Sequence, residues 1–172
     1  MNQLPNFANQ NIFEQKTTPE FLVFHNLETP EHGASLGAWP LHVTLLGPVQ
    51  LQGQDPLSQL RKLVHTIAAE LQPFVVQKGP RAMYGPDEDV EVTLIRDESK
   101  TLHNIHNRLL LGASGIGFSG FDDRWSGPRF SPHVTDKGER SVSADSLVVD
   151  SVSICSKLAG EKQVLETVRL TS

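Results

Sequence analysis

Cysteine is almost absent from this 172-residue chain, and several other features are missing with it. The single cysteine, Cys155, cannot form an internal disulfide, and its apolar-patterned surroundings favour a buried, inert thiol. No apolar run approaches the roughly 20 residues that a membrane-spanning helix needs. Residues 1–15 are polar and rich in Asn and Gln, unlike a signal peptide. These absences predict a cytoplasmic protein without a membrane partner.

Positive charge is also scarce. Fifteen Lys and Arg against twenty Asp and Glu give a formal net charge of −5. Proteins that coat long nucleic acids carry broad basic faces, so no long duplex is expected as a partner. A pocket that holds one or two phosphates needs only a few local donors. No Gly-rich dinucleotide or P-loop fingerprint is present, and no cofactor is expected.

The pattern of apolar residues and breakers predicts one domain over residues 1–172, with the first 16–20 residues as a loose extension. Strands are predicted at 21–27, at 41–49 (closed by Gly47-Pro48), and at 74–76, 90–95, 133–135, 147–154 and 164–170. Helices are predicted from Asp55-Pro56, with Asp55 as N-cap, to before Pro73, and over 99–111. A loop with Gly79-Pro80 and Gly85-Pro86 separates the strands at 74–76 and 90–95, and residues 112–131 are predicted to be irregular. This order predicts the α+β class, with antiparallel sheets and helices packed outside them.

The tripeptide His-Val-Thr occurs twice, at residues 42–44 and 133–135, and each copy lies in a predicted strand. Successive side chains of a strand point to opposite faces, so the histidine and threonine of each copy share one face, about 7 Å apart. The valine between them points to the other face, into the core. Each copy therefore presents an imidazole beside a hydroxyl.

Two such pairs facing each other across a cleft suit phosphoryl chemistry. Histidine titrates near neutral pH, so one of His42 and His133 can be a neutral base while the other is a protonated acid. Opening a 2′,3′-cyclic phosphate needs a base that activates water and an acid that protonates the departing ribose oxygen. The hydroxyls of Thr44 and Thr135 can donate hydrogen bonds to the non-bridging oxygens. This arrangement requires no metal. The alternative is that both tripeptides are ordinary strand residues.

The amino-acid sequence around both copies resembles that of the two-histidine phosphoesterase superfamily, especially its 2′-5′ RNA ligase-like branch. That superfamily is marked by two strand-borne His-x-Thr/Ser motifs fewer than about a hundred residues apart. Residues 41–48 resemble the first motif running into its Gly-Pro turn, residues 74–92 the strand pair after the first helix, and residues 130–135 the second motif. The resemblance spans about 21–170. The sequence departs from the superfamily pattern in two places. The loop before the first motif is short, and Asp136-Lys137-Gly138 follows the second motif.

The resemblance implies a bilobal fold of two pseudo-symmetric lobes, each with an antiparallel sheet and outer helices. It places the active cleft between the lobes and implies activity on 2′,3′-cyclic phosphates, 2′-5′ linkages or related ribose phosphates. Carried over by position, His42 and His133 are the acid–base pair, and Thr44 and Thr135 bind the phosphate.

Residues near the second motif are further candidates. Trp125 and Phe130, and with less support Trp39 and Tyr84, could stack on a base, although aromatic residues also form cores. Arg129 and Lys137 could neutralise phosphate, or be solvated surface charges like Arg124 and Arg140. His25 is more simply structural, and His103 with His106 lacks the further ligands that a metal site needs.

The resulting hypothesis is a metal-independent, monomeric phosphodiesterase acting on a nucleotide or an RNA terminus. The reverse reaction, sealing RNA ends with a 2′-5′ bond, uses the same acid–base pair. A module that binds RNA ends or nucleotides without turnover and a metal-dependent hydrolase are the alternatives from other classes.

Overall fold

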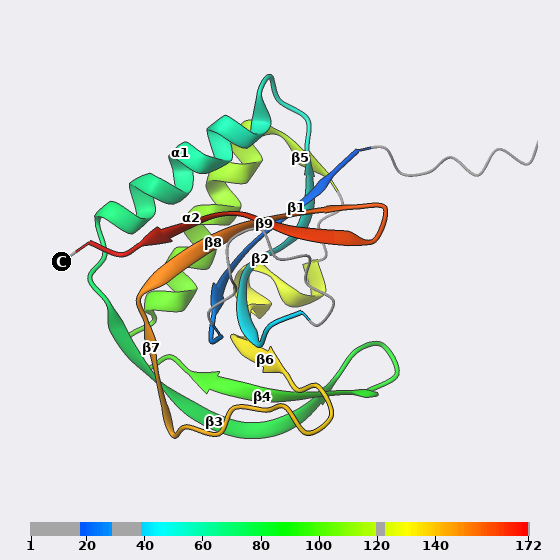
Figure 1. The fold of residues 1–172 in the computed structure, drawn as a ribbon, viewed down its shortest axis with the longest axis vertical. Helices are drawn as coiled ribbons and strands as arrows, with labels where there is room; N and C mark the ends of the chain where they lie inside the picture. The colour runs from blue at the N-terminus through cyan, green and yellow to red at the C-terminus, as the bar shows by residue number, and fades with distance from the viewer. Residues whose placement is uncertain (1–17, 29–38, 120–122, 172) are drawn as a thin grey trace, which may run out of the picture.

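A computed structural model describes residues 18–28, 39–119 and 123–171, and these form one curled, nine-stranded sheet with two helices (Figure 1). The strands are β1 (Glu20–Asn26), β2 (His42–Leu51), β3 (Phe74–Tyr84), β4 (Val90–Arg96), β5 (Phe118–Ser119), β6 (His133–Thr135), β7 (Ser146–Val149), β8 (Ser151–Leu158) and β9 (Glu161–Arg169). The helices are α1 (Pro56–Ala69) and α2 (Thr101–Ile116), and two short 3-10 turns cover Asp123–Trp125 and Gly127–Arg129. The predicted α+β class is confirmed.

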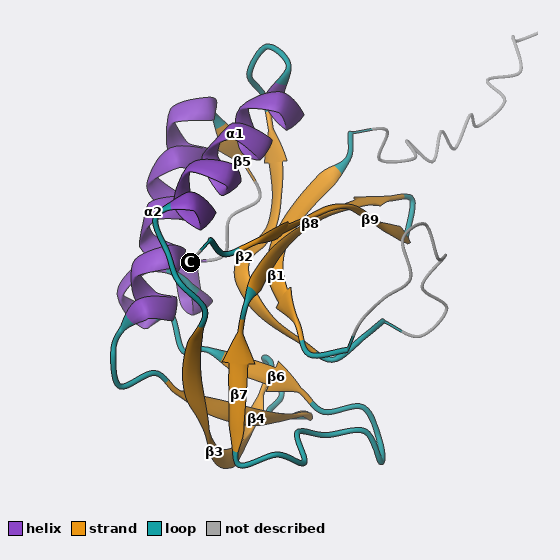
Figure 2. Ribbon diagram, turned by 60° about the vertical axis from the view of Figure 1, so that its left-hand side comes forward, coloured by secondary structure: helices purple, strands orange, loops and turns teal. Residues whose placement is uncertain are grey.

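The strand order β7-β3-β4-β6-β2-β1-β8-β9 divides the sheet into two halves that meet between β6 and β2. All pairings are antiparallel. One half holds β2, β1, β8 and β9, and the other holds β6, β4, β3 and β7. Figure 2 shows these halves as the upper and lower parts of the curled sheet, with both helices together on one side. The bilobal architecture is therefore built on one continuous sheet.

Helix α2 runs five residues beyond the predicted end, because its two internal glycines do not stop it. Gly112 lies against α1: a Cβ at this position would stand 2.4 Å from Cδ2 of Leu63. The missing side chain lets the two helices approach each other, and that packing offsets the weak helix propensity of glycine. Helix α1 begins and ends as predicted, but the side chain of Asp55 makes no capping hydrogen bond.

Gly85-Pro86 separates β3 from β4 as predicted, but two other Gly-Pro pairs that were predicted to end or separate strands lie inside strands, so those predictions were wrong. Gly47-Pro48 lies inside β2, where the pairing with β1 shifts register between Phe21 and Val23. Gly79-Pro80 lies inside β3, where the pairing with β4 shifts between Lys78 and Arg81. Proline cannot donate a ladder hydrogen bond, and a bulge is one of the few places where a strand tolerates it.

The predicted strand 147–154 is two strands in different halves of the molecule. β7 pairs with β3, and β8 pairs with β1. Asp150 lies between them, and its carboxylate accepts hydrogen bonds from Ser151 and Arg169. The chain crosses from one half to the other at this residue, which the continuous apolar pattern did not reveal.

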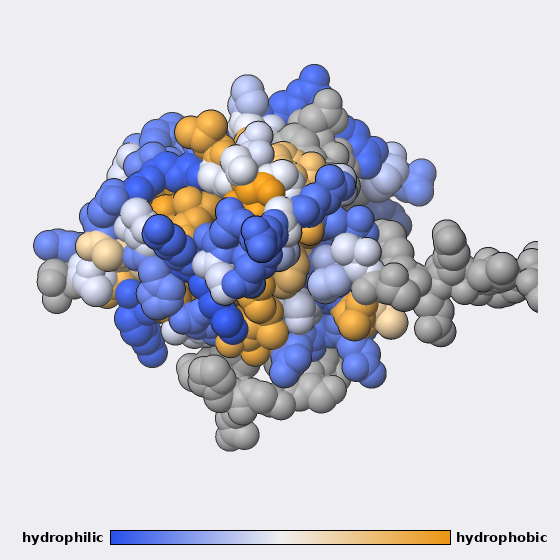
Figure 3. Space-filling model, turned by 90° about the horizontal axis from the view of Figure 1, so that it is seen from above, coloured by the Kyte–Doolittle hydropathy of each residue, from blue (hydrophilic) through white to orange (hydrophobic). Residues whose placement is uncertain are grey.

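The core lies between the helices and the sheet and includes the valine of both His-Val-Thr copies, neither of which is exposed to solvent. The single cysteine is buried as predicted, and burial raises the pKa of its thiol to about 11. The face drawn in Figure 3 is mainly hydrophilic, with several separate hydrophobic patches. Among the described residues, neither helix has the length and apolar character needed to cross a membrane.

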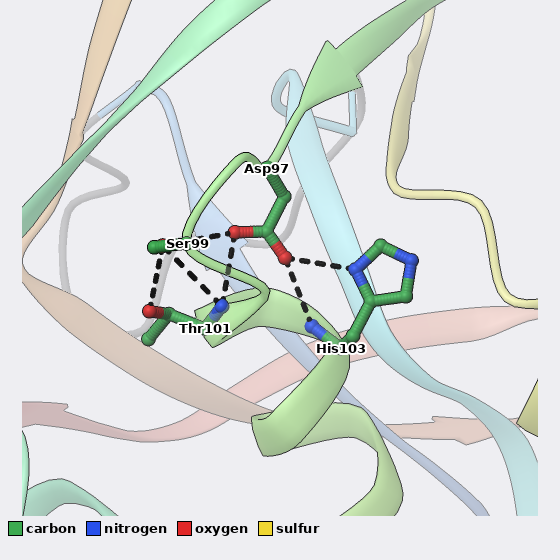
Figure 4. A network of polar contacts seen from close by, with 4 residues as sticks. All are labelled: Asp97, Ser99, Thr101 and His103. Carbon is green, nitrogen blue, oxygen red and sulfur yellow. Dashed lines mark hydrogen bonds and ion pairs between the residues drawn. The ribbon is translucent and has the colours of Figure 1, made fainter.

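At the start of α2, a buried carboxylate accepts the hydrogen bonds that an N-cap side chain would ordinarily accept. Figure 4 shows Asp97 accepting hydrogen bonds from the backbone N–H groups of Thr101 (3.0 Å) and His103 (3.1 Å). It also accepts from Nδ1 of His103 at 2.8 Å and from the hydroxyl of Ser99 at 3.3 Å. The carboxylate thus satisfies backbone donors at the start of the helix that have no partner within it.

Replacing Asp97 with alanine is expected to lower the free energy of unfolding by about 2 kcal/mol, because α2 loses these acceptors in a buried position. Urea unfolding measures the loss. The Asp97→Asn variant keeps one acceptor oxygen and should lose less. A loss below about 0.5 kcal/mol for Asp97→Ala would show that the network is not stabilising.

Candidate functional site

The two His-Val-Thr copies lie on neighbouring, hydrogen-bonded strands. Val43 of β2 pairs with Val134 of β6 in antiparallel register. This register puts His42 across from Thr135 and leaves His133 as its diagonal neighbour, at a spacing of about 7–8 Å. The histidines and threonines are half-buried on one face of the sheet, and the valines are buried on the other. The copies thus meet at the junction of the two halves, within one sheet.

Both motif histidines are held in the same way by the carbonyl two residues before them. Nδ1 of His42 lies 2.8 Å from the carbonyl oxygen of Pro40, and Nδ1 of His133 lies 2.8 Å from that of Ser131. A carbonyl oxygen only accepts, so Nδ1 carries the proton in each ring. Nε2 is then the nitrogen left for proton transfer. These two backbone contacts place both imidazoles in the same tautomer.

The surroundings of the two rings differ. His42 packs against the edges of Phe24 and Trp39, and Nε1 of Trp39 donates a hydrogen bond to its Nε2 at 3.1 Å. His133 lies beside Tyr84, with ring centroids 4.8 Å apart, and lines a cavity of about 550 Å³. His42 is not among the residues that line that cavity, and the indole occupies its Nε2. Its Nε2 must therefore lose the indole partner before it reaches a substrate.

Both rings are neutral at pH 7 in the absence of ligand. Burial lowers the pKa of His42 to about 4, and the positive charges of Lys137 and Lys162 contribute to the lowering. Burial also lowers the pKa of His133, against the opposing effect of the hydrogen bond to Ser131. A neutral imidazole with a free Nε2 lone pair is the form that acts as a base.

We expect the free energy of unfolding to fall as the pH is lowered from about 6.5 toward 4. In this range an unfolded chain binds a proton at His42 that the folded protein does not, so the stability present above pH 6.5 is lost. The loss for this one group is about 3 kcal/mol. Urea unfolding across the range measures it. The His42→Gln variant should depend less on pH, and an unchanged dependence would contradict the low pKa.

The cavity joins both threonines to an aromatic wall. Its described lining includes Thr44, Tyr84, Trp125, Phe130, His133 and Thr135. The rings of Tyr84 and Trp125 stack at 4.9 Å, and 38% of Trp125 is exposed. A planar base could lie against this wall. The structure thus brings together the four motif residues, and both Trp125 and Phe130 adjoin them.

The two predicted basic residues are placed differently. Arg129 is exposed and does not line the cavity. Lys137 lies in a turn that its backbone closes with Arg140, and its ammonium donates to the carbonyl oxygen of Trp39. β6 therefore ends at Thr135, and Lys137 comes near His42 rather than into the cavity.

The sequence reasoning missed the role of His106. This buried ring donates from Nδ1 to the carbonyl oxygen of Leu45 (2.7 Å) and accepts at Nε2 from the N–H of Gly127 (2.8 Å). It also stacks on Phe130 at 4.0 Å. His106 therefore fastens the segment before the second motif to β2. No spacing in the sequence signals this contact, which joins three distant segments.

The other described histidines have structural partners. His25 is buried and hydrogen-bonds the carbonyl oxygen of Ser151, and His65 is exposed and pairs with Glu166. His103 binds Asp97. Within the part of the chain that the structure describes, no group of three or more His, Cys, Asp or Glu residues could hold a metal ion. The loop before the first motif falls mostly in 29–38, outside the described residues.

Comparison with known proteins extends these observations. The fold resembles a crystal structure described as a phosphoesterase, with a TM-score of 0.63, 18% identity, and coverage of 90% of this chain and 99% of that one. Escherichia coli LigT complexed with 3′-AMP has a TM-score of 0.61 and 17% identity, and the match covers 90% of this chain and 99% of that one. TT0787 of Thermus thermophilus has a TM-score of 0.60 and 20% identity, with coverage of 88% of this chain and 97% of that one. At these identities the likeness shows the fold. No curated protein matches the sequence.

A family profile covers the part of the chain that carries the site. The profile of the 2′-5′ RNA ligase superfamily matches residues 22–158, from the first strand to the end of β8. That range includes both His-Val-Thr copies and the Tyr84–Trp125 wall beside them. The protein therefore belongs to the 2′-5′ RNA ligase superfamily.

Proposed function

We propose that this protein is a metal-independent phosphodiesterase that opens 2′,3′-cyclic phosphates or cleaves 2′-5′ linkages at nucleotide or RNA ends. The observation that carries the proposal is the pairing of the two motifs: two imidazoles in the same tautomer and two hydroxyls share one face of the sheet. Membership of the superfamily supports the same chemistry.

The reaction needs two proton transfers at one phosphorus. One imidazole takes a proton from water through Nε2 as the water oxygen attacks phosphorus. The bond from phosphorus to a ribose oxygen breaks, and the other imidazole, protonated, gives its proton to that oxygen. A bound phosphate anion stabilises an imidazolium beside it, so it raises the pKa of one histidine above its value in the empty site. Thr44 and Thr135 donate hydrogen bonds to the non-bridging oxygens.

Nucleotides are the proposed substrate class. Solved structures of the similar Escherichia coli LigT are described as complexes with 3′-AMP, NADP+, phosphate and ATP. In the present chain, the Tyr84–Trp125 wall offers an aromatic surface next to the motif residues, and stacking on such surfaces accepts any base.

Turnover of nucleoside 2′,3′-cyclic phosphates and of 2′-5′-linked dinucleotides in excess chelator tests the proposal. Activity that persists with chelator supports it, and the product isomer shows which ribose oxygen leaves. Activity restored only by a divalent metal would favour a metal-dependent hydrolase. Joining of RNA halves without hydrolysis would favour the reverse, ligase reaction. Binding without turnover would favour a binding module.

A further inference from the structure

Two lysines from separate elements converge on the residue that covers His42. Lys137 follows β6, and its ammonium donates to the carbonyl oxygen of Trp39. Lys162 is near the start of β9, and its Nζ lies 4.3 Å from the centroid of the Trp39 ring. The indole N–H of the same tryptophan binds Nε2 of His42. Both ammonium groups therefore lie beside His42, outside the cavity that His133 and both motif threonines line.

The ring contacts place Lys162 close to His42, one of the two proposed proton-transfer groups. The ring centroids of Trp39 and His42 are 5.3 Å apart, and Nζ of Lys162 lies 4.3 Å from the Trp39 centroid. The distance from Nζ of Lys162 to the centroid of the imidazole therefore cannot exceed the sum of these two distances. Neither lysine lines the cavity that holds Thr44 and Thr135. The pair can thus reach a second phosphate, while the motif residues hold the first.

Neither lysine forms an ion pair with a described carboxylate, although the charge of Glu28 raises the pKa of Lys137. Among the described residues, no carboxylate oxygen lies within 4 Å of Nζ of Lys137 or Lys162, and the nearby Glu28 pairs with Arg140. Burial lowers the pKa of both lysines, and nearby positive charges, including that of Lys162 on Lys137, lower it further. A bound anion would remove this repulsion. In a chain with net charge −5, such a local excess of positive charge is typical of an anion site.

The aromatic wall sets the direction of a bound nucleotide. Tyr84 stacks on Trp125 and lies beside His133, whereas both lysines lie beside His42. In a nucleotide, the base at C1′ and the 5′-carbon at C4′ flank the ring oxygen, and both lie on the face of the ribose opposite the 2′ and 3′ oxygens. With its base on the wall and its 2′,3′-phosphate between the histidines, a nucleotide directs its 5′ side away from the wall.

We propose that Lys137 and Lys162 form a subsite for a second phosphate, either the 5′-phosphate of a nucleotide or the preceding phosphodiester of an RNA end. The inference rests on the proposed function for the identity of the first phosphate. It assigns the protein a preference for substrates with at least two phosphates over nucleosides that carry only the cyclic one.

Steady-state kinetics on three substrates test the preference: adenosine 2′,3′-cyclic phosphate, its 5′-phosphorylated form, and ApA ending in a cyclic phosphate. The second phosphate is expected to raise kcat/KM about tenfold through charge-assisted hydrogen bonds, mainly by lowering KM. Lys162→Gln and Lys137→Gln should each remove most of that gain, so that the ratio of kcat/KM between the two-phosphate substrates and the first substrate falls toward one. Lys62→Gln, the same charge change at an exposed position of α1, is the matched control and should keep the gain.

The substrate that shows the gain identifies the ligand of the subsite. A gain in kcat/KM only with the ApA substrate would assign the subsite to an RNA chain. A gain with both the ApA substrate and the 5′-phosphorylated nucleotide would assign it to any second phosphate.

Calorimetric binding of adenosine 3′-phosphate and adenosine 3′,5′-bisphosphate separates the two proposals. A preference for the bisphosphate that Lys162→Gln removes would support the subsite even if no cyclic phosphate is turned over. Equal kcat/KM on all three substrates, or an equal loss on all of them in the lysine variants, would overturn the subsite and leave the proposed function intact.

Discussion

Replacement of His133 with alanine is expected to lower kcat/KM on a cyclic phosphate by roughly two to four orders of magnitude, and replacement of His42 by a similar factor. In the proposed mechanism each ring supplies one of the two proton transfers, and general acid–base catalysis contributes on this scale. Because both transfers belong to one reaction, the double variant should lose much less than the product of the two single losses. Initial rates with a nucleoside 2′,3′-cyclic phosphate in chelator measure these effects.

The control for this prediction is His65→Ala. His65 is exposed on α1 and pairs only with Glu166 among the described residues, so the variant should keep activity within about twofold. Circular dichroism and urea unfolding establish that each variant is folded. A folded His42→Ala or His133→Ala protein with more than about a tenth of the wild-type activity would contradict the two-histidine mechanism.

Replacement of Phe24 with alanine is expected to lower the free energy of unfolding by about 3–5 kcal/mol. Phe24 is fully buried in the middle of β1, and its ring makes edge contacts with Trp39 (5.4 Å) and His42 (5.2 Å). The truncation leaves a cavity directly beneath a motif histidine. Urea unfolding at pH 7, well above the pKa of about 4 of His42 in the folded protein, measures the loss.

The Phe24→Leu variant separates volume from aromatic contact. Leucine fills most of the space, so this variant should lose less stability than the alanine variant. A loss below about 1 kcal/mol in Phe24→Ala would show that the structure closes around the site and that the ring is not a required support.

The local features of the motif strands could be predicted from the sequence. The two-residue period of a strand puts the histidine and threonine of each copy on one face whatever the strand pairs with, and both valines are buried as that period requires. The Asp55-Pro56 start of α1 and the α+β class were predicted by equally local signals. The His-Val-Thr repeat also identified the superfamily that the profile then showed.

Several local signals failed where packing opposed them. Gly112 did not end α2, because its missing side chain lets α1 approach. Gly47-Pro48 and Gly79-Pro80 did not end strands, because register shifts in the pairing accommodate prolines that cannot donate a hydrogen bond. At Asp150 the chain changes halves without any break in its apolar pattern. In each case a partner distant in sequence decided the outcome.

By itself, the sequence determined which side chains carry the candidate chemistry and that each imidazole stands beside a hydroxyl, because strand periodicity is a property of the local backbone. Only the tertiary structure decided that Val43 pairs with Val134, so that two segments about 90 residues apart form one site. It also decided that Trp39 covers His42 and that Lys162 joins Lys137 there. These contacts join elements whose meeting depends on the order of strands across the whole sheet, and no short stretch of sequence contains that order.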